Sequence, residues 1–589
     1  MKSAKTHRFA YLLAAVCLAA FLLRLTAGLQ LLASDPFVSS PPSTTDMATY
    51  KTISEAILKG SFPKEFYYQP FYYAVFLPFI QLLTGPSDFM IVLAQALCGM
   101  LAVLFTGLAA ARIAGKKAGI AAAVLLAFSH IAILYTPYRL IEISQLLWFT
   151  LLLFLTLDSM RKGGTLRWFL TGIVLSFAIL SRGNAWCFLP AILLAFHYGE
   201  CRFRKSGKKA VLLSLSLLFA GIILPQIPFA AVNSVHYGCL RGPSTAGSAV
   251  LALGNTKEAP PGGLEYPLSY EIWTKNEAVR SVPMRILDWF LEEPLAYLEL
   301  TFRKCFLFWN KYDIPNNINP VIMTKRSQLL SSVPLIPTGF LLVLCLAAVL
   351  MNLKRVCRHR FLAVFLLFLC FYWLAAAAFY NLGRFRIPAF GFFCIAGGLC
   401  IAELIRKFRK KEYRKLVLYH GFALTAAIFI VYPGYDLYRE YLESSLIRIA
   451  RPSGVQVPVP GQGRMVTDHG PRSFGGWNLV KGNYFRKTFA AKTVPGTVVP
   501  LSIALCRTAD DPIPVLRING QQFVLSDMKT GALAYPTLKI PYPQDGVFHI
   551  EVYGALSAAA DLQREYGRTM TGEGTPLPYE LLMKIRLPE

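Results

Sequence analysis

Long apolar blocks, separated by short polar segments, make up the first three quarters of the chain. A block of about 17–25 apolar residues is what a helix needs to cross the hydrocarbon core of a bilayer. The blocks lack the strict alternation of a membrane β-strand, so helices satisfy their backbone groups in lipid. We therefore predict a polytopic α-helical membrane protein. Its candidate blocks lie at residues 9–32, 71–84, 89–111, 118–136, 143–158, 166–181, 184–198, 210–232, 332–353, 361–381, 387–405 and 416–434.

One of these blocks is too short for a full crossing. Residues 71–84 form the shortest run, with Pro70 directly before it and Pro78 inside it. A helix of this length reaches about 21 Å, whereas the hydrocarbon core is about 30 Å thick. We therefore expect a juxtamembrane or re-entrant element here.

The distribution of basic residues supports this assignment. If the short block crossed the membrane, several dense basic loops would lie on the outer side. Without that crossing, every basic cluster faces the cytoplasm, which is the usual bias of membrane proteins, and about eleven spanning helices remain. These clusters lie at residues 2–8, 112–117, 161–167, 202–209, 354–360 and 406–415.

The same topology predicts the domain organisation. A transmembrane domain covers residues 1–435, a linker covers 436–455, and a soluble extracytoplasmic domain covers 456–589. Lys2, Lys5 and the apolar run after them resemble a signal peptide, but no small-residue cleavage site follows, so we expect an uncleaved first helix. The outer loops of the transmembrane domain are expected at residues 33–88, 137–142 and 233–331.

The last segment changes in character, because Pro, Gly and Asp become frequent and strand-like runs appear. Residues 514–526 contain two such runs joined by Asn519-Gly520, a strong signal for a type I′ hairpin turn. Further runs lie at 498–506, 547–554 and 579–587. We predict a C-terminal β-sandwich-like domain.

Composition and charge exclude other classes of function. Lys and Arg number 60 against 33 Asp and Glu, a formal net charge of +27. This excess is spread over short loops and forms no basic stripe with interleaved aromatics, so we expect no nucleic-acid partner. The 12 cysteines include no CxxC pair and no zinc-type spacing. Cys239 and Cys506 both fall in outer segments, and a disulfide between them is left open.

Asp46 is the first outer carboxylate with a candidate role. It precedes a helix expected from Met47 to Lys59 and ended by Gly60. In one interpretation Asp46 only caps the start of this helix. In the other it takes a proton from an acceptor hydroxyl, a typical task of a carboxylate.

Glu142 is the second outer carboxylate, at the mouth of an outward-facing helix. If the segment is helical, Arg139 lies three residues away on the same face and forms a local ion pair of little energetic weight. The alternative is that Glu142 positions an acceptor or a metal ion. Both interpretations are open from the residues alone.

Several arginines stand on the outer side, against the charge bias. Arg384 and Arg386 in YNLGRFRIPAF are suited to a lipid phosphate, because guanidinium binds phosphate oxygens bidentately. Ordinary lipid headgroups are the alternative partner. Arg182 in LSRGNAW has the same character. For Arg24, near the outer end of the first helix, one interpretation is that it snorkels to the interface.

The long outer loop contains an amphipathic stretch at residues 285–306, followed by WNKYDIPNN. A helix lying on the membrane surface explains the stretch, with Trp309 as an interfacial anchor. Sugar contact by Trp309, Asn310 or Asp313 is the alternative.

Together these features resemble the GT-C glycosyltransferases, a class that includes protein O-mannosyltransferases and the lipid A aminoarabinose transferase. Their general layout is a first helix with an arginine, an outer loop with an acidic residue, a short juxtamembrane helix, a second acidic outer residue and an RY-x-x-P-like motif. This order is matched here, over roughly residues 9–434, by FLLRL, TTDMATYKTISEAILKG, QPFYYAVFLPFIQLLTG, YRLIEIS and GRFRIPAF.

Three positions depart from the family pattern. Gln69 stands where many relatives have a basic residue, Glu142 stands for an aspartate, and Phe385 stands for the tyrosine of the RY motif. These departures bear on donor-phosphate contacts and on the identity of the acceptor. They leave the expected class unchanged.

The resemblance implies an inverting transferase of the plasma or inner membrane that moves a sugar from a polyprenyl-phosphate donor to an extracytoplasmic acceptor. Asp46 would deprotonate the acceptor and Glu142 would orient it, with no certain cofactor, although a divalent cation stays compatible. The β domain would bind a glycan acceptor or cap the site. The implied substrate-binding residues are Tyr50, Gln69, Tyr72, Arg139, Arg182, Arg384 and Arg386.

Two other functions are open. A transporter or flippase of a lipid-linked sugar would favour mid-membrane charges and internal repeats, and neither is evident in the sequence. A structural membrane protein that displays a β domain would leave the polar outer loops without a role.

Overall fold

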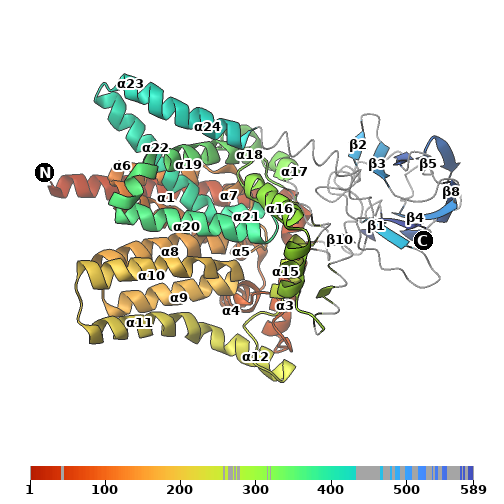
Figure 1. The fold of residues 1–589 in the computed structure, drawn as a ribbon, viewed down its shortest axis with the longest axis horizontal. Helices are drawn as coiled ribbons and strands as arrows, with labels where there is room; N and C mark the ends of the chain where they lie inside the picture. Colours follow the sequence, from red (N-terminus) through yellow and green to blue (C-terminus); the bar gives the residue numbers. More distant parts are fainter. Residues whose placement is uncertain are drawn as a thin grey trace.

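The computed structural model describes residues 2–41, 45–256, 279–314, 316–318 and 320–432, with some positions between 259 and 277. In the last part of the chain it describes the strands from residue 464 on and the turn Asn519-Gly520. The first part is a helical bundle, which confirms the predicted fold class (Figure 1). In the described residues, 7 helical segments are long and apolar enough to cross a membrane. They are His7–Ser34, Asp88–Ala114, Glu142–Lys162, Lys208–Tyr237, Thr338–Val356, Arg360–Ala378 and Gly383–Arg409.

Each of these segments contains one or two main helices of the bundle. Their bounds are α1 (Lys2–Ser34), α5 (Asp88–Ala114), α8 (Glu142–Lys162), α11 (Lys208–Ile223) with α12 (Ile227–Tyr237), α19 (Thr338–Asn352), α20 (Arg360–Ala378) and α22 (Phe390–Arg409).

The other four predicted spans fall on shorter helices. Figure 1 shows these helices running alongside the longer ones, so each is part of the same bundle. The total of about eleven crossings stays a prediction, because length and composition establish only the longer helices. The shorter helices are α6 (Lys116–Ala127) with α7 (His130–Leu134), α9 (Thr165–Ser181), α10 (Leu189–Phe196) and α24 (Phe422–Val431).

The block at 71–84 forms a π-helical turn, η1 (Phe71–Phe76), followed by α4 (Leu77–Thr84). Figure 1 shows α4 at the end of the bundle, close to α3 (Asp46–Leu58). Ser54 of α3 donates a hydrogen bond of 2.8 Å to Gln81 of α4, which fixes the two short helices together. This placement agrees with a juxtamembrane element.

Small residues allow the bundle helices to approach closely. A Cβ on Gly172 of α9 would lie 2.2 Å from the Leu218 carbonyl oxygen of α11. A Cβ on Gly398 of α22 would lie 2.6 Å from the Ala118 carbonyl oxygen of α6. Small residues at such crossings are typical of membrane helices, whose association depends on van der Waals packing.

Arg24 is part of this packing, so the interpretation that it snorkels is wrong. It is fully buried and donates hydrogen bonds to the carbonyl oxygens of Leu126 and Ala127, at 3.0 and 3.3 Å. These carbonyls belong to the last turn of α6, where no intrahelical donor remains. The Arg24 guanidinium therefore supplies hydrogen bonds to carbonyl oxygens at the C-terminus of α6.

The long outer loop is folded into short helices: α13 (Gly247–Gly254), α15 (Val282–Glu292), α16 (Pro294–Leu307), α17 (Pro320–Lys325) and α18 (Gln328–Ser332). Lys304 of α16 is completely buried. Its Nζ donates to the carbonyl oxygens of Gly254 and Phe379 and to Asn255 Oδ1, at 2.9, 2.9 and 3.0 Å. It ties α16 to α13 and to the chain after α20.

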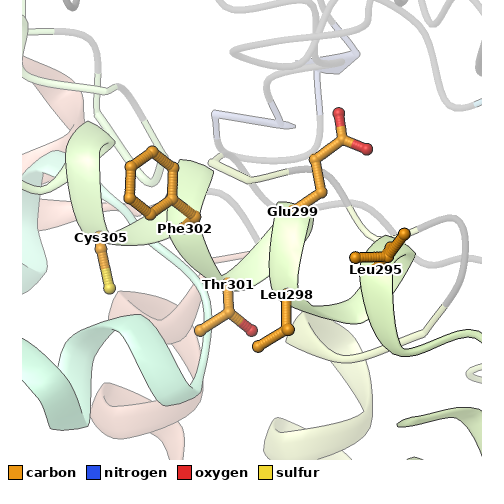
Figure 2. Close-up of a pocket in the computed structure, with 6 residues that line it drawn as sticks. All are labelled: Leu295, Leu298, Glu299, Thr301, Phe302 and Cys305. Carbon is orange, nitrogen blue, oxygen red and sulfur yellow. The ribbon is translucent and has the colours of Figure 1, made fainter.

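The amphipathic stretch is two helices, α15 and α16, because Pro294 begins a new one. Six residues of α16 line a hollow (Figure 2): Leu295, Leu298, Glu299, Thr301, Phe302 and Cys305. Leu295 is 81% exposed and Phe302 is 64% exposed. Such an apolar outer face is typical of a helix that lies in the membrane interface, which stays our prediction for α16.

Trp309, by contrast, is no interfacial anchor. It is 6% exposed and its ring packs against Trp373 of α20, with ring centroids 5.8 Å apart. The amphipathic stretch ends at residue 306, and the chain turns inward after α16. Trp309 is therefore a core residue.

The C-terminal strands form two five-stranded antiparallel sheets and one two-stranded sheet. The first has the path β1-β12-β4-β7, with β8 also paired to β4, and the second has the order β2-β3-β9-β5-β6. Their strands are β1 (Arg464–Asp468), β2 (Asn478–Val480), β3 (Tyr484–Ala490), β4 (Val498–Cys506), β5 (Val515–Ile518), β6 (Gln521–Val524), β7 (Leu533–Ala534), β8 (Thr537–Pro541), β9 (Val547–Tyr553) and β12 (Leu582–Leu587). The two-stranded sheet pairs β10 (Thr571–Gly572) with β11 (Thr575–Pro576).

The predicted hairpin turn is confirmed. Asn519 and Gly520 have φ of +48° and +83°, and Ile518 pairs with Gln521 across them. Positive φ at both central residues defines the type I′ turn that matches strand twist. The domain boundaries at 435 and 456 stay predictions. Cys239 is a free, exposed cysteine, and the side chain of Cys506 lies outside the described residues.

Candidate active site

Asp46 is the first residue of α3, not its N-cap. The cap is Thr45, whose hydroxyl oxygen accepts a hydrogen bond of 3.3 Å from the Ala48 amide. The helix ends at Leu58, and Gly60 follows with φ of +80°, as the sequence predicts. Because Thr45 satisfies the helix start, the Asp46 carboxylate is available for other contacts. The interpretation of Asp46 as a simple cap is therefore wrong.

Arg384 makes those contacts from the short helix α21 (Gly383–Arg386), between α20 and α22. Its Nη2 donates to Asp46 Oδ2 at 2.5 Å, and its Nη1 donates to Glu142 Oε1 at 3.2 Å. One guanidinium thus joins two carboxylates that lie far apart in the sequence. Arg384 is 5% exposed, so these contacts are shielded from water.

Glu142 is the first residue of α8 and is completely buried. Besides Arg384, its Oε1 accepts a hydrogen bond of 2.9 Å from Nη2 of Arg182. Arg182 follows the last residue of α9, where the backbone turns from helical to extended. We call Asp46, Glu142, Arg182 and Arg384 the charge cluster. Its two carboxylates and two guanidiniums balance in formal charge.

Several polar atoms of the charge cluster have no partner in the described part of the chain. These buried atoms are Glu142 Oε2, Arg182 Nη1 and Arg384 Nε. Buried polar groups in native proteins are normally hydrogen-bonded, so such unpaired atoms need an explanation, and a ligand is one. Asp46 is different, since its side chain is 30% exposed. The cluster therefore combines an accessible carboxylate with unpaired cationic donors.

The protonation state of Asp46 favours the charged form. Burial by itself raises the pKa of Asp46, but Arg384 and the Asn317 amide outweigh it and hold the pKa below its usual range. Burial, with the charge of Asp46, raises the pKa of Tyr50 well above its ordinary value. At neutral pH, Asp46 is an anion and the Tyr50 hydroxyl keeps its proton.

Asn317 is a contact of Asp46 that the sequence did not single out. Its Nδ2 donates to Asp46 Oδ2 at 3.0 Å, across 271 positions of sequence. Of the contacts to Asp46 that the structure describes, this one and the Arg384 contact both fall on Oδ2. No local sequence signal marks a residue whose partner is so distant.

Arg386, two residues after Arg384, does not join the charge cluster. It is 4% exposed and donates to the carbonyl oxygens of Phe308, Asn310 and Tyr312. It also donates to Asp313 Oδ1 at 2.8 Å. With so many protein acceptors, its guanidinium is occupied in holding residues 308–313. The structure thus gives Arg386 a structural environment, unlike the phosphate contact expected for it.

Asp313 and Asn310 belong to the same structural contact. Asp313 Oδ2 accepts a hydrogen bond of 2.7 Å from the Thr338 hydroxyl, and Asn310 Oδ1 accepts one of 2.7 Å from the Tyr312 amide. Both carboxylate oxygens of Asp313 are therefore engaged by protein. Asp313 thus presents no free carboxylate oxygen for sugar contact, whereas Asn310 Nδ2 is buried without a partner in the described part of the chain.

Arg139 also differs from the expectation. It donates to Asp88 and to the carbonyl oxygen of Val38, and it is 3% exposed. The predicted pairing with Glu142 required a helix through both residues, but α8 begins at Glu142. The local ion pair is therefore wrong, and Arg139 joins the start of α5 to the outer loop.

Three further residues implied by the family lie around α3. Tyr50 is 7% exposed and stacks on Tyr73, with ring centroids 5.8 Å apart. Tyr72 is fully buried, and its hydroxyl donates to Gln95 at 3.0 Å, so it is part of the core. Gln69 is partly exposed and reaches Gly183, where a Cβ would lie 3.3 Å from its Nε2. Tyr50 and Gln69 thus stay candidates beside the cluster.

Phe385, the departure from the RY motif, has a defined role in packing. The Arg182 guanidinium carbon lies 4.1 Å from its ring centroid, and that of Arg384 lies 5.1 Å from it. An aromatic face attracts a guanidinium in this way. The ring holds the two arginines of the charge cluster without the hydroxyl of a tyrosine.

The described residues contain no group of three or more His, Cys, Asp or Glu side chains suited to a metal ion. The two carboxylates of the cluster are joined by Arg384 instead. The hollow on α16 includes none of the cluster residues.

Comparison with known families finds a match over part of the chain. Residues 68–229 match the family described as dolichyl-phosphate-mannose-protein mannosyltransferase. The matched segment contains Glu142 and Arg182, whereas Asp46 and Arg384 lie outside it. A search of curated protein sequences finds no match.

Three solved structures show weak similarity to this chain. The archaeal oligosaccharyltransferase AglB from Archaeoglobus fulgidus is 16% identical, with a TM-score of 0.43 over 76% of this chain and 59% of that one. ArnT from Cupriavidus metallidurans, bound to undecaprenyl phosphate, is 13% identical, with a TM-score of 0.28 over 78% and 93%. Arabinosyltransferase EmbB from Mycobacterium smegmatis is 12% identical, with a TM-score of 0.27 over 97% and 64%. This chain spans about three fifths of the length of the archaeal enzyme.

Proposed function

We propose that the protein transfers a sugar from a polyprenyl-phosphate donor to an acceptor hydroxyl on the extracytoplasmic side of the membrane. One observation supports this most: an accessible carboxylate, Asp46, and two guanidiniums with unpaired N–H groups lie in one cluster. The carboxylate suits proton removal, and the guanidiniums suit a phosphate. The family match supports the donor class, because its description names a dolichyl-phosphate sugar.

The sidedness of the bundle supports the location. Figure 1 shows the N-terminus and α23 (Tyr413–Lys415) at one end of the bundle, and α3, α15 and α21 at the other. The first end carries basic residues of the predicted cytoplasmic loops. The charge cluster is at the opposite end, which the positive-inside bias assigns to the outer face.

In the proposed reaction, Asp46 accepts the proton of the acceptor hydroxyl through Oδ1. The acceptor oxygen attacks the anomeric carbon of the donor, and the bond from that carbon to the phosphate oxygen breaks. The products are the glycosylated acceptor, with inverted configuration, and the polyprenyl phosphate anion. A positioned carboxylate base contributes about 10²–10⁴-fold in such a step.

Arg182 and Arg384 stabilise the leaving phosphate. Arg182 Nη1 and Arg384 Nε are buried and have no partner in the described part of the chain. A charge–charge contact is stronger in such a buried environment than in water. When a phosphate binds there, it competes with Asp46 for Arg384, so the Asp46 carboxylate becomes more basic as the donor arrives. Preorganised donors of this kind lower the barrier at the point where charge develops.

Transfer is tested with the purified full-length protein in liposomes. Radiolabelled polyprenyl-phosphate hexoses and pentoses are supplied with an envelope extract as acceptor, and labelled products are counted. We expect transfer by the wild type and its loss in Asp46→Asn. The matched control is Asp288→Asn, because Asp288 is an outer carboxylate that pairs with Arg280 away from the cluster. Wild-type activity in Asp46→Asn would contradict the role of Asp46.

A second measurement separates transfer from transport. A fluorescent polyprenyl-phosphate sugar is placed in one leaflet, and its movement to the other leaflet is followed by quenching. We expect no movement above that of empty liposomes. Translocation without transfer would replace the proposed function with that of a flippase.

A further inference from the structure

Asn317 occupies a position that invites a role in the proposed reaction. It is 4% exposed and lies in the segment between α16 and α17. Its side-chain amide donates to Asp46 Oδ2, the same oxygen that accepts from Arg384. Facing a carboxylate, an amide must present its NH₂ group, so the contact favours the charged form of Asp46.

The segment that carries Asn317 is fixed to the helix that carries Arg384. Arg386 of α21 binds the 308–313 backbone, and the Gly383 amide donates to the Ile314 carbonyl oxygen at 3.0 Å. A Cβ on Gly383 would lie 2.7 Å from the Ile314 nitrogen, so only glycine permits this approach. Residues 308–314 and α21 therefore form one packed unit, and Asn317 lies three positions after Ile314.

Both donors to Asp46 thus lie within this unit or a few residues after it. Arg384 reaches Asp46 directly from α21, and Asn317 reaches it through the segment that Arg386 and Gly383 hold. Two donors on Oδ2 fix the rotation of the carboxylate plane. Oδ1 accepts no hydrogen bond in the described part of the chain, so it is the oxygen left for an incoming hydroxyl.

We infer that Asn317 is a positioning residue for the Asp46 base. It sets which carboxylate oxygen accepts the proton, and it keeps Asp46 ionised. This inference rests on the proposed function, in which Asp46 is the base. It also gives Arg386 a purpose, because that residue holds the segment that delivers Asn317.

The kinetic test compares Asn317→Ala, Asn317→Asp and the matched control Asn316→Ala. Asn316 is the neighbouring amide, is 7% exposed, and truncation removes the same atoms. We expect kcat to fall about 10- to 100-fold in Asn317→Ala, as for loss of a hydrogen bond to a charged group, with little change in KM. Asn316→Ala should stay within a few-fold of the wild type.

The pH profile separates positioning from a merely structural effect. Removing the amide raises the pKa of Asp46, so the acid limb of kcat/KM should move to higher pH in Asn317→Ala. Asn317→Asp keeps the shape but faces Asp46 with a second carboxylate, so it should move the limb further. A wild-type kcat and acid limb in Asn317→Ala, or equal changes in Asn316→Ala, would overturn the inference.

A measurement without substrate keeps this test independent of the transferase proposal. A water-soluble carbodiimide modifies protonated carboxyl groups, and mass spectrometry of the Asp46 peptide gives the pH midpoint of labelling. We expect the midpoint to rise in Asn317→Ala and to stay unchanged in Asn316→Ala. An unchanged midpoint in both would refute the role of Asn317. Absence of sugar transfer by the wild type would instead refute the proposed function.

Discussion

The two ends of the bundle both bury carboxylates beside arginines, yet they differ in how completely those groups are paired. We call the end with α3, α21 and the charge cluster the site end, and the end with the loops at 112–117 and 161–167 the basic end. At the basic end, Asp158 binds Arg112 and lies 3.4 Å from Lys162 and 3.5 Å from Arg167. Both of its carboxylate oxygens have cationic partners.

Glu200 shows the same completeness at the basic end. Its Oε1 accepts from the Gly164 amide and from Trp168 Nε1, at 3.1 and 2.9 Å, and its Oε2 accepts from Ser206 at 2.8 Å. It joins the start of α9 to the loop before α11. Such a fully paired group stabilises the fold and has no spare capacity for a ligand.

The site end leaves atoms unpaired in the same kind of environment. Glu142 Oε2, Arg182 Nη1 and Arg384 Nε are buried without a partner in the described part of the chain. Each such atom costs about 1–3 kcal/mol if nothing binds it. The comparison teaches that buried charge alone does not mark a site; at the site end, unpaired charged groups lie together with an accessible carboxylate.

Asp46→Asn should break the site end most severely. Loss of the base should reduce transfer about 1,000-fold, in the range expected for general base catalysis. The folded protein should persist, because Thr45 still caps α3. The measurement is the initial rate per folded molecule, with Asp288→Asn as the reference. A rate within tenfold of the wild type would remove the distinction between the two ends.

The pair Arg384→Lys and Arg386→Lys sharpens the comparison within α21. Lysine keeps the charge but loses the planar fork of donors. Arg384→Lys should lower kcat about 100-fold with little change in melting temperature. Arg386→Lys should lower the melting temperature, because the 308–313 segment loses its contacts. Reversed effects would show that the two roles are exchanged.

Asp158→Asn tests the basic end. We expect the free energy of unfolding to fall by about 1–3 kcal/mol. The reason is that Asp158 loses its charged contacts with Arg112, Lys162 and Arg167. Transfer per folded molecule should equal that of the wild type. Thermal melting in detergent and the transfer assay together decide the outcome. A large fall in turnover would mean that the basic end also contributes to the reaction.

Lys304→Met should have the smallest effect on sugar transfer, and its effect on the free energy of unfolding depends on pH. Burial lowers the pKa of Lys304 to about 7. Between this value and the ordinary lysine pKa, Lys304 is neutral in the folded state and protonated in the unfolded state. The wild type should therefore gain melting temperature relative to Lys304→Met as pH rises through this window. A pH-independent difference would show that Lys304 stays charged, matched by its three oxygen acceptors.

Periodicity and charge predicted the helical bundle, the short element at 71–84 and the type I′ turn at Asn519-Gly520. Each depends on local information, either the length of an apolar run or the φ preference of two residues. Asp46, Glu142, Arg182 and Arg384 were also found, since outer charges beside membrane helices are rare and conspicuous.

The sequence could not distinguish Arg384 from Arg386. Residues two apart on a helix point about 200° apart, so one faces the cluster and the other faces residues 308–313. The sequence also left Asp46 open as the N-cap of α3, whereas the structure gives this position to Thr45. Asn317 was missed because its partner lies 271 positions away. These outcomes depend on tertiary packing, which local pattern does not encode.

The most direct test of the central claim is a structure of the full-length protein with polyprenyl phosphate bound, solved by cryo-electron microscopy in nanodiscs. We predict that phosphate oxygens lie within hydrogen-bond distance of Arg182 and Arg384, with Asp46 Oδ1 open to the outer face. A phosphate held instead by Arg112 and Arg167, or one distant from both ends, would contradict the assignment of the unpaired groups as a donor site.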